Sequence, residues 1–133
     1  MGECLIQRVL VDTCALIWLA TGDAKLSRSA RETIQDAELL CFSSISIWEI
    51  ARKVKKGELE IPVTPGRFAD MLVRQYSMKE LPLDHAIMLH DSALPEIHKD
   101  PADRFIIATA LLNGCVVVTG DRRFPEYGIE TVQ

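Results

Sequence analysis

Short apolar runs alternate with longer amphipathic stretches along the chain, and this predicts strands that alternate with helices. Apolar runs of about four residues have the length of buried strands and are too short for helices. They predict strands at residues 8–11, 39–42 and 116–119, and a short extended piece at 80–83. The stretches between them predict helices at about residues 13–22, 27–36, 44–56, 65–76, 84–90 and 101–113. Such alternation favours parallel strands with right-handed crossovers, hence an α/β fold with a mainly parallel central sheet flanked by helices.

Residues that cap helices stand at the ends of these predicted helices. Thr13 is the expected cap of the first helix, which ends near Gly22. Ser44 or Ser46 is the expected cap of the helix that Gly57 terminates. Ser and Thr accept hydrogen bonds from free N–H groups at a helix start, and glycine adopts the left-handed conformation at a helix end.

The last long helix is apolar nearly all round. Asp100 and Pro101 open it, and Asn113 and Gly114 end it. A helix of this kind is buried by the sheet on one side and by other helices or a second subunit on the other. We therefore expect a homodimer.

The length of 133 residues favours a single domain over residues 1–133, with a core that buries roughly two-thirds of the surface of the unfolded chain. The chain is 48% hydrophobic and 26% charged, and these fractions are those of ordinary globular proteins rather than disordered ones. Its amino terminus lacks the pattern of a secretion signal, and no apolar run reaches the length of a bilayer span. The sequence predicts a cytoplasmic protein with no membrane partner.

Cysteine and histidine give little support to a zinc site. His85, His90 and His98 form no HExxH pair. The four cysteines form no CxxC pair, and most lie in apolar segments where a reduced cysteine packs as a small hydrophobic residue: Cys4, Cys14, Cys41 and Cys115. Any metal site in this chain is therefore expected to use oxygen ligands.

Acidic residues follow two of the predicted strands and open a helix. Asp12 follows the first strand, Asp121 follows the last, and Asp103 lies at the start of the apolar helix. The carboxyl ends of neighbouring parallel strands meet at one edge, where open α/β sheets bind ligands. Packed carboxylates repel one another and need cations or protons. Oxygen-rich sites suit Mg²⁺ or Mn²⁺, which bind substrate phosphates, so the pattern indicates phosphoester chemistry.

Each of these acids also has a structural interpretation. Asp12 fits a helix cap, Asp100 and Asp103 fit the cap and first turn of their helix, and Asp121 fits a surface turn. Such interactions contribute about 0.5–2 kcal/mol each, which is enough to explain one of them without function. From their positions we assign Asp12 and Asp103 to a metal and Asp100 mainly to capping. Asp121 is assigned to the same site, with the Thr119 hydroxyl as a further oxygen.

Glu49 has the pattern of a surface residue when it is taken alone. It points away from the apolar stripe of its helix and stands four residues before Lys53, as in a solvated ion pair. Its helix nevertheless follows a predicted strand directly, so the start of that helix lies at the acidic edge. The residues alone favour the ion pair and leave a ligand role open.

The formal charge of −4 lacks the basic footprint of most nucleic-acid-binding proteins. Two divalent ions at the acids would cancel this charge, so phosphate binding is not excluded. Trp18 and Trp48 are predicted to lie in the core. The basic residues that could place a phosphate near the acids are otherwise ordinary solvated charges: Arg52, Lys56, Arg104, Arg122 and Arg123.

Four ordered segments resemble the motifs of one family: residues 12–19 (DTCALIWL), 44–50 (SISIWEI), 100–104 (DPADR) and 119–121 (TGD). They are similar to the motifs of PIN-domain ribonucleases and, more narrowly, of VapC-type toxins of type II toxin–antitoxin pairs. The resemblance extends from Val9 to about Thr131. Cys14 and Ala102 depart from the residues that are common in the family, without removing an acid. These departures leave the choice of substrate open.

The resemblance implies a Mg²⁺- or Mn²⁺-dependent endoribonuclease with a PIN-like three-layer fold. Its catalytic metal ligands would be Asp12, Glu49, Asp103 and Asp121, so the resemblance overturns the surface interpretation of Glu49. It also implies a dimer, an RNA substrate cut to leave a 5′-phosphate, and a small antitoxin in the acidic groove. The residues expected to support the ligands are Asp100, Thr13, Ser44 and Thr119.

Two other functions remain as alternatives. An aspartate-dependent phosphotransferase would use Asp12 as its nucleophile, but Cys14 stands where haloacid-dehalogenase-like phosphatases carry a second acid. A non-catalytic protein-binding module with the same fold would use the acids only as helix caps. That module predicts little loss from Asp103→Asn, whereas a nuclease loses its metal-dependent cleavage.

Overall fold

A five-stranded parallel sheet forms the centre of the molecule in the computed structural model, which describes residues 7–133. Its strands stand in the order β3-β2-β1-β4-β5, and each neighbouring pair is parallel. They are β1 (Arg8–Val11), β2 (Leu39–Ser43), β3 (Lys79–Leu81), β4 (Val116–Val118) and β5 (Thr131–Val132). Strand β1 lies in the middle, with Val9 opposite Leu40 on one side and Val116 on the other.

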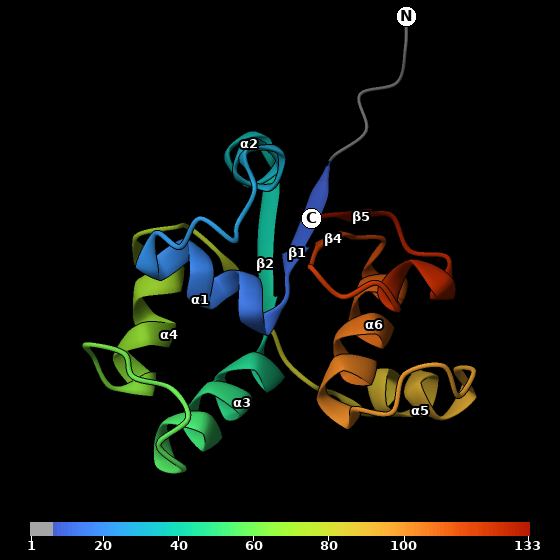
Figure 1. Ribbon diagram of the computed structural model, residues 1–133. Coiled ribbons are helices and arrows are strands. Elements are labelled where there is room, and N and C mark those ends of the chain that lie inside the picture. Colours follow the sequence, from blue (N-terminus) through green and yellow to red (C-terminus); the bar gives the residue numbers. More distant parts are fainter. Residues whose placement is uncertain (1–6) are drawn as a thin grey trace, which may run out of the picture.

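Six α-helices flank this sheet. They are α1 (Thr13–Thr21), α2 (Arg28–Asp36), α3 (Ser44–Lys55), α4 (Pro65–Arg74), α5 (His85–Ala93) and α6 (Pro101–Asn113). Figure 1 shows α1 and α4 on one side of the sheet and α5 and α6 on the other. The predicted three-layer α/β fold is confirmed.

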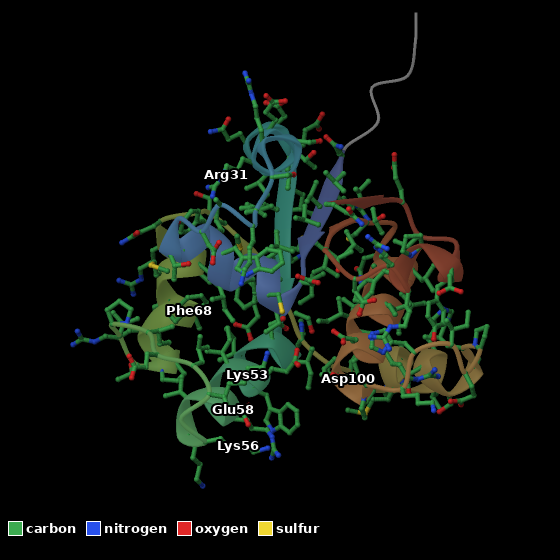
Figure 2. The ribbon with its side chains drawn as sticks, viewed as in Figure 1. Arg31, Lys53, Lys56, Glu58, Phe68 and Asp100 are labelled. Carbon is green, nitrogen blue, oxygen red and sulfur yellow. The ribbon has the colours of Figure 1, made fainter. Side chains whose placement is uncertain are left out.

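Alternating side chains of the strands fill two cores, one on each face of the sheet. Val9 and Val11 pack with Leu16 of α1 and Phe68 of α4, whose position Figure 2 labels. Leu10 belongs to the second core, with residues of α6 such as Ile106 and Ile107. Because both faces are covered, the central strands β1, β2 and β4 are largely apolar, and this explains the runs in the sequence.

The apolar helix α6 is buried within its own chain, by the sheet on one side and by contacts with α5 and α3 on others. Leu112, near its end, is 47% exposed. The other exposed apolar side chains of this layer, Met88 and Leu89, lie on α5 instead. Most of the apolar surface of α6 therefore needs no second subunit to cover it.

Two predicted helix caps are wrong by one residue or more. Asp12, not Thr13, caps α1 and accepts a hydrogen bond from the Ala15 N–H at 2.9 Å. Ser43, not Ser44 or Ser46, caps α3. In both places the strand passes into the helix almost without a loop, so the last extended residue takes the role of the cap.

The other helix ends agree with their local signals. Ser27 caps α2 and Asp100 caps α6. Gly22 and Gly114 end α1 and α6 in the left-handed conformation, with φ of 68° and 64°. These ends depend on neighbouring residues alone, which is why the sequence predicts them.

The carboxyl-terminal elements differ most from the prediction. The sequence pattern predicts neither β5 nor the short 3₁₀ helix Phe124–Tyr127, because two to four residues carry no measurable periodicity.

Two helices end at other residues than the sequence predicts. Helix α5 extends to Ala93, three residues beyond the predicted end, and α4 ends at Arg74, two residues before its predicted end. Cys4 lies outside the described residues. Within residues 7–133, no helix combines the length and the apolar character needed to cross a membrane.

Candidate metal centre

The carboxyl edge of the sheet brings together acidic residues from four separate segments of the chain. Asp12 follows β1, Asp121 follows β4 at a distance of three residues, Glu49 lies on the helix that β2 enters, and Asp103 lies in the first turn of α6. Strands β2, β1 and β4 are neighbours, so these segments end side by side. The negative charges of Glu49, Asp12 and Asp121 all raise the pKa of Asp103, which places Asp103 within electrostatic reach of each of the other three.

Asp12 is 5% exposed and is the most buried of the four acids. Burial raises its pKa to about 6, although hydrogen bonds from Thr119 and from the Ala15 N–H act in the opposite direction. The charges of Glu49 and Asp121 add to the rise. Capping uses the Oδ1 atom of Asp12, so the capping and ligand interpretations of this residue are compatible.

Glu49 is half-buried and tied to α1. The Thr13 hydroxyl donates to its Oε1 atom at 2.5 Å and lies 2.9 Å from the Ser46 hydroxyl. Burial raises the pKa of Glu49 above its usual range, against the effect of the Thr13 bond. No ion pair joins Glu49 to Lys53 in the described part of the chain. The solvated ion pair favoured by the residue pattern alone is therefore wrong.

Asp103 has the largest shift among the acids of the site. Burial is the main cause, and the charges of Asp100, Glu49, Asp12 and Asp121 follow, so that its pKa rises to about 7. Its Oδ2 atom lies 3.2 Å from the Nε2 atom of the buried His98. Such a shift shows negative charge that the protein does not compensate by itself.

Asp121 differs because hydrogen bonds surround it. Burial raises its pKa, but bonds from the Arg123 N–H, the His98 ring and the Arg123 side chain outweigh burial and hold the pKa below its usual range. The Arg123 N–H donates to Oδ1 at 2.9 Å, and His98 Nε2 lies 2.7 Å from Oδ2. Asp121 therefore stays ionised at lower pH than Asp12 and Asp103 do.

The tightest group of candidate ligands in the described residues consists of His98, Asp103 and Asp121, whose ligand atoms lie within 4.8 Å of one another. Asp12 and Glu49 lie outside this group but act on it through their charge. The donors are mainly carboxylate oxygens, which suit a hard divalent cation. The raised pKa values of Asp12 and Asp103 fit such a cation as well, because its charge would relieve their repulsion.

Comparison with known proteins identifies the family. A family model described as the PIN domain matches residues 9–130, a range that contains all four acids. This chain belongs to the PIN domain family. The resemblance seen in the sequence is confirmed.

One curated relative of this PIN domain is a ribonuclease, and the solved structures with a similar fold include VapBC complexes. The PIN domain is 28% identical over 116 residues to Ribonuclease VapC22 of Mycobacterium tuberculosis, covering 86% of this chain and 88% of that one. The structure of VapBC2 from Rickettsia felis bound to a promoter DNA fragment matches with a TM-score of 0.69 at 12% identity, covering 95% of this chain and 98% of that one. DNA-bound VapBC from Salmonella typhimurium matches with a TM-score of 0.66 at 22% identity, covering 95% and 97%.

The residues around the four acids of this PIN domain agree only in part with the expected supporting set. Thr13 contacts Glu49, and Thr119 contacts Asp12. Thr119 Oγ1 also accepts from the Asp121 N–H at 3.0 Å. Asp100 caps α6, as predicted, and its charge raises the pKa of Asp103. Ser44 makes no side-chain hydrogen bond to these acids within residues 7–133, and Ser46 takes the place beside Thr13.

Arg104 does not face a substrate. Its side chain is 9% exposed and donates to the carboxylate and carbonyl of Asp91 and to the carbonyls of Pro95 and His98. It therefore holds the segment between α5 and α6 in place. Because its partners lie 6 to 13 residues away, sequence spacing did not reveal this role.

His98 is the functional candidate that sequence reasoning missed. The sequence pattern gives it no partner for a zinc site, although it stands two residues before Asp100, the cap of α6. In the structure it is 1% exposed and contacts both Asp103 and Asp121. The local signal was its nearness to the acidic helix start.

A shallow depression of about 140 Å³ lies beside Glu49 on α3, lined by Trp48, Glu49, Arg52, Lys53, Lys56 and Glu58. Trp48 is 53% exposed, so its predicted place in the core is wrong, and the Arg52 guanidinium lies 4.8 Å from its ring centre. Figure 2 shows Lys53 and Lys56 along α3 and Asp100 where α6 begins. Trp18, in contrast, packs against the core as predicted. This surface joins an aromatic ring to positive charges next to an acid of the site.

Proposed function

We infer that this PIN domain is a Mg²⁺- or Mn²⁺-dependent endoribonuclease that hydrolyses RNA phosphodiester bonds, and that it is the toxin of a toxin–antitoxin pair. The observation that carries this proposal is the convergence of Asp12, Glu49, Asp103 and Asp121 from four chain segments at one edge of the sheet. The relative named Ribonuclease VapC22 supports the same reaction class. The phosphotransferase and binding-module alternatives are not favoured by these relatives.

The four acids are the catalytic and metal-binding residues of this proposal. A bound divalent cation supplies positive charge for the substrate phosphate and activates water near neutral pH. Thr13 orients Glu49, and His98 with Arg123 orients Asp121. Asp12 is oriented by its bonds at the start of α1. No side chain of the protein then needs to act as a nucleophile, and cleavage is expected to leave a 5′-phosphate.

RNA is expected to approach over α3 and the segment after Asp121. Arg52, Lys53 and Lys56 border the depression beside Glu49, and Arg122 is exposed next to Asp121. Exposed Trp48 offers a ring on which an unpaired base can stack. The negative net charge of −4 is thus not spread evenly, because basic side chains gather at one side of the acids.

The proposed protein partners are an antitoxin and a second copy of the chain. VapBC2 of Rickettsia felis and VapBC of Salmonella typhimurium are complexes bound to DNA, which supports an antitoxin that binds this PIN domain too. Met88 and Leu89 on α5 are 48% and 67% exposed and form an apolar surface suited to a homodimer. Light scattering of the wild type and of Leu89→Glu tests the dimer. The cytoplasmic location expected from the sequence stays part of this proposal.

RNA cleavage by purified variants tests the reaction. Asp12→Asn and Asp103→Asn are expected to lose Mg²⁺-dependent cleavage while they keep their circular dichroism spectrum. Asp36→Asn is the matched control, because Asp36 is an exposed acid at the end of α2. Sequencing of RNA ends after induced expression identifies the target. Cleavage by both Asn variants at the rate of the control would exclude the proposed mechanism.

A further inference from the structure

The imidazole of His98 uses both of its nitrogens. Nε2 lies 2.7 Å from Asp121 Oδ2 and 3.2 Å from Asp103 Oδ2. On the other side of the ring, Nδ1 accepts a hydrogen bond from the Asp100 backbone N–H at 3.1 Å. The side chain is 1% exposed, so water does not compete for either nitrogen.

The bond from Asp100 decides which nitrogen of His98 carries the proton. A neutral imidazole has one donor nitrogen and one acceptor nitrogen. A backbone N–H can only donate, so Nδ1 must offer its lone pair and the proton must be on Nε2. That proton is donated to Asp121 Oδ2, and Asp103 Oδ2 lies 3.2 Å from the same nitrogen. An Nε2 atom that carries a proton has no lone pair for a cation.

The surrounding residues hold both the backbone and the ring of His98. The His98 N–H donates to the Tyr127 hydroxyl at 2.7 Å, and the His98 carbonyl accepts from Arg104 at 3.3 Å. Tyr127 in turn donates to the Pro95 carbonyl at 3.0 Å. The His98 ring packs edge-to-face against the Phe124 ring, with 6.0 Å between the ring centres and 80° between the ring planes. Both the backbone and the ring of His98 are therefore held.

We propose that His98 is a positioning residue that holds Asp121 beside Asp103 through a hydrogen bond from Nε2–H to Asp121, and that it is not itself a metal ligand. This inference rests on the proposed metal-dependent function. A carboxylate oxygen has two lone pairs, so Asp121 Oδ2 can accept from His98 and still face a cation. His98, Asp103 and Asp121 have the spacing of a metal site, yet the proton on Nε2 makes His98 a donor within it.

Nitrogen chemical shifts of the labelled wild-type protein test the proton position directly. We expect His98 to carry its proton on Nε2, both without metal and after addition of Mg²⁺. Cd²⁺ is the stricter probe, because it binds nitrogen more readily than Mg²⁺ does. Loss of the Nε2 proton on addition of Cd²⁺ would overturn the proposal and make His98 a ligand.

Calorimetry of Mg²⁺ and Mn²⁺ binding separates the two roles in variants. His98→Ala should lower the affinity for both ions by a similar factor, about 10-fold or more, because the variant loses a residue that orients metal ligands. His98→Gln should restore most of this affinity, because its amide N–H reaches to a similar place. His85→Gln, at an exposed position of α5, is the control and should bind both ions as the wild type does. A much larger loss for Mn²⁺ than for Mg²⁺, without rescue by Gln, would contradict the proposal.

The outcomes remain distinct from a failure of the proposed function. If His98→Ala does not fold, the shifts of the wild type and the affinity of His98→Gln still decide the matter. If the wild type binds both ions and keeps the Nε2 proton but cleaves no RNA, the nuclease proposal fails and the role of His98 stands. If RNA is cleaved and His98 coordinates Cd²⁺, only the role of His98 fails.

Discussion

The Thr13 hydroxyl donates to Glu49 Oε1 at 2.5 Å and thereby ties the start of α1 to the middle of α3. Thr13 is buried, and its neighbour Asp12 is another acid of the site. One hydrogen bond therefore sets the direction of Glu49 relative to the end of β1. It also explains why Glu49 is not paired with Lys53 along its own helix.

Loss of this bond should disturb the site more than the fold. Thr13→Val keeps the shape of the side chain but removes the hydroxyl, at a cost of about 1 kcal/mol in the free energy of unfolding. We expect RNA cleavage and Mg²⁺ affinity to fall, because Glu49 loses its orientation. Thr13→Ser keeps the hydroxyl and should retain most activity. Equal activity in Val and Ser variants, measured with folded protein, would show that the bond has no role in catalysis.

The metal-free protein should lose stability as the pH rises. The pKa of Asp103 rises from 3.8 to about 7 on folding, and that of Asp12 to about 6. Between the unfolded and folded values, the folded state binds more protons than the unfolded state, so the free energy of unfolding falls with increasing pH. Thermal melts in a chelator should therefore show a lower midpoint at pH 8 than at pH 5.5.

Neutral variants should remove part of this pH dependence. At pH 8 without metal, the free energy of unfolding of Asp12→Asn should exceed that of the wild type by roughly 1 kcal/mol or more, since one pKa unit corresponds to about 1.4 kcal/mol. Mg²⁺ should stabilise the wild type. This stabilisation should become smaller below about pH 7, because Asp103 then takes up a proton and binds the cation less well. Asp36→Asn should show the pH profile of the wild type. A wild-type melting midpoint that rises between pH 5.5 and pH 8 would contradict the predicted sign.

Arg104 should be needed for stability rather than for RNA contact. Arg104→Met leaves the Asp91 carboxylate and the His98 carbonyl without this donor, while the Pro95 carbonyl keeps only the Tyr127 hydroxyl. Breaking a buried charge pair in this way costs about 3 kcal/mol in the free energy of unfolding, measured by urea denaturation. Arg122→Met removes an exposed charge instead and should change stability little. If both variants unfold at the same urea concentration, the anchoring role assigned to Arg104 is incorrect.

Trp48 should affect RNA binding without affecting stability. Its side chain is 53% exposed beside Arg52, so Trp48→Ala removes little buried surface. Loss of one stacked base weakens binding by about 1–3 kcal/mol. We expect KM for a single-stranded RNA to rise while kcat stays near its original value, and Trp48→Phe to be intermediate. Val73→Ala removes an exposed apolar residue on α4 as a control; the same KM in all these variants would exclude stacking on Trp48.

The sequence by itself determined the central strands, the six α-helices and the places of the acids along the chain. Strand β1 and the two ends of α6 follow from apolar run length and from caps that act over a few residues. Asp12 and Asp121 follow neighbouring parallel strands, and such strands necessarily end at one edge of the sheet. This part of the site needs only the order of elements along the chain.

Only the tertiary structure decided the surroundings of these acids. Glu49 meets Thr13 across 36 residues of sequence, and His98 meets Asp121 across 23. Whether Arg104 is buried and Trp48 exposed depends on which faces of α6 and α3 other elements cover. Helical periodicity predicts that a helix has a buried face, but the partner of each side chain is set by how helices from distant parts of the chain pack together. Because of that packing, Glu49, whose residue pattern indicates a surface ion pair, instead makes a partly buried hydrogen bond to Thr13 at the acidic edge.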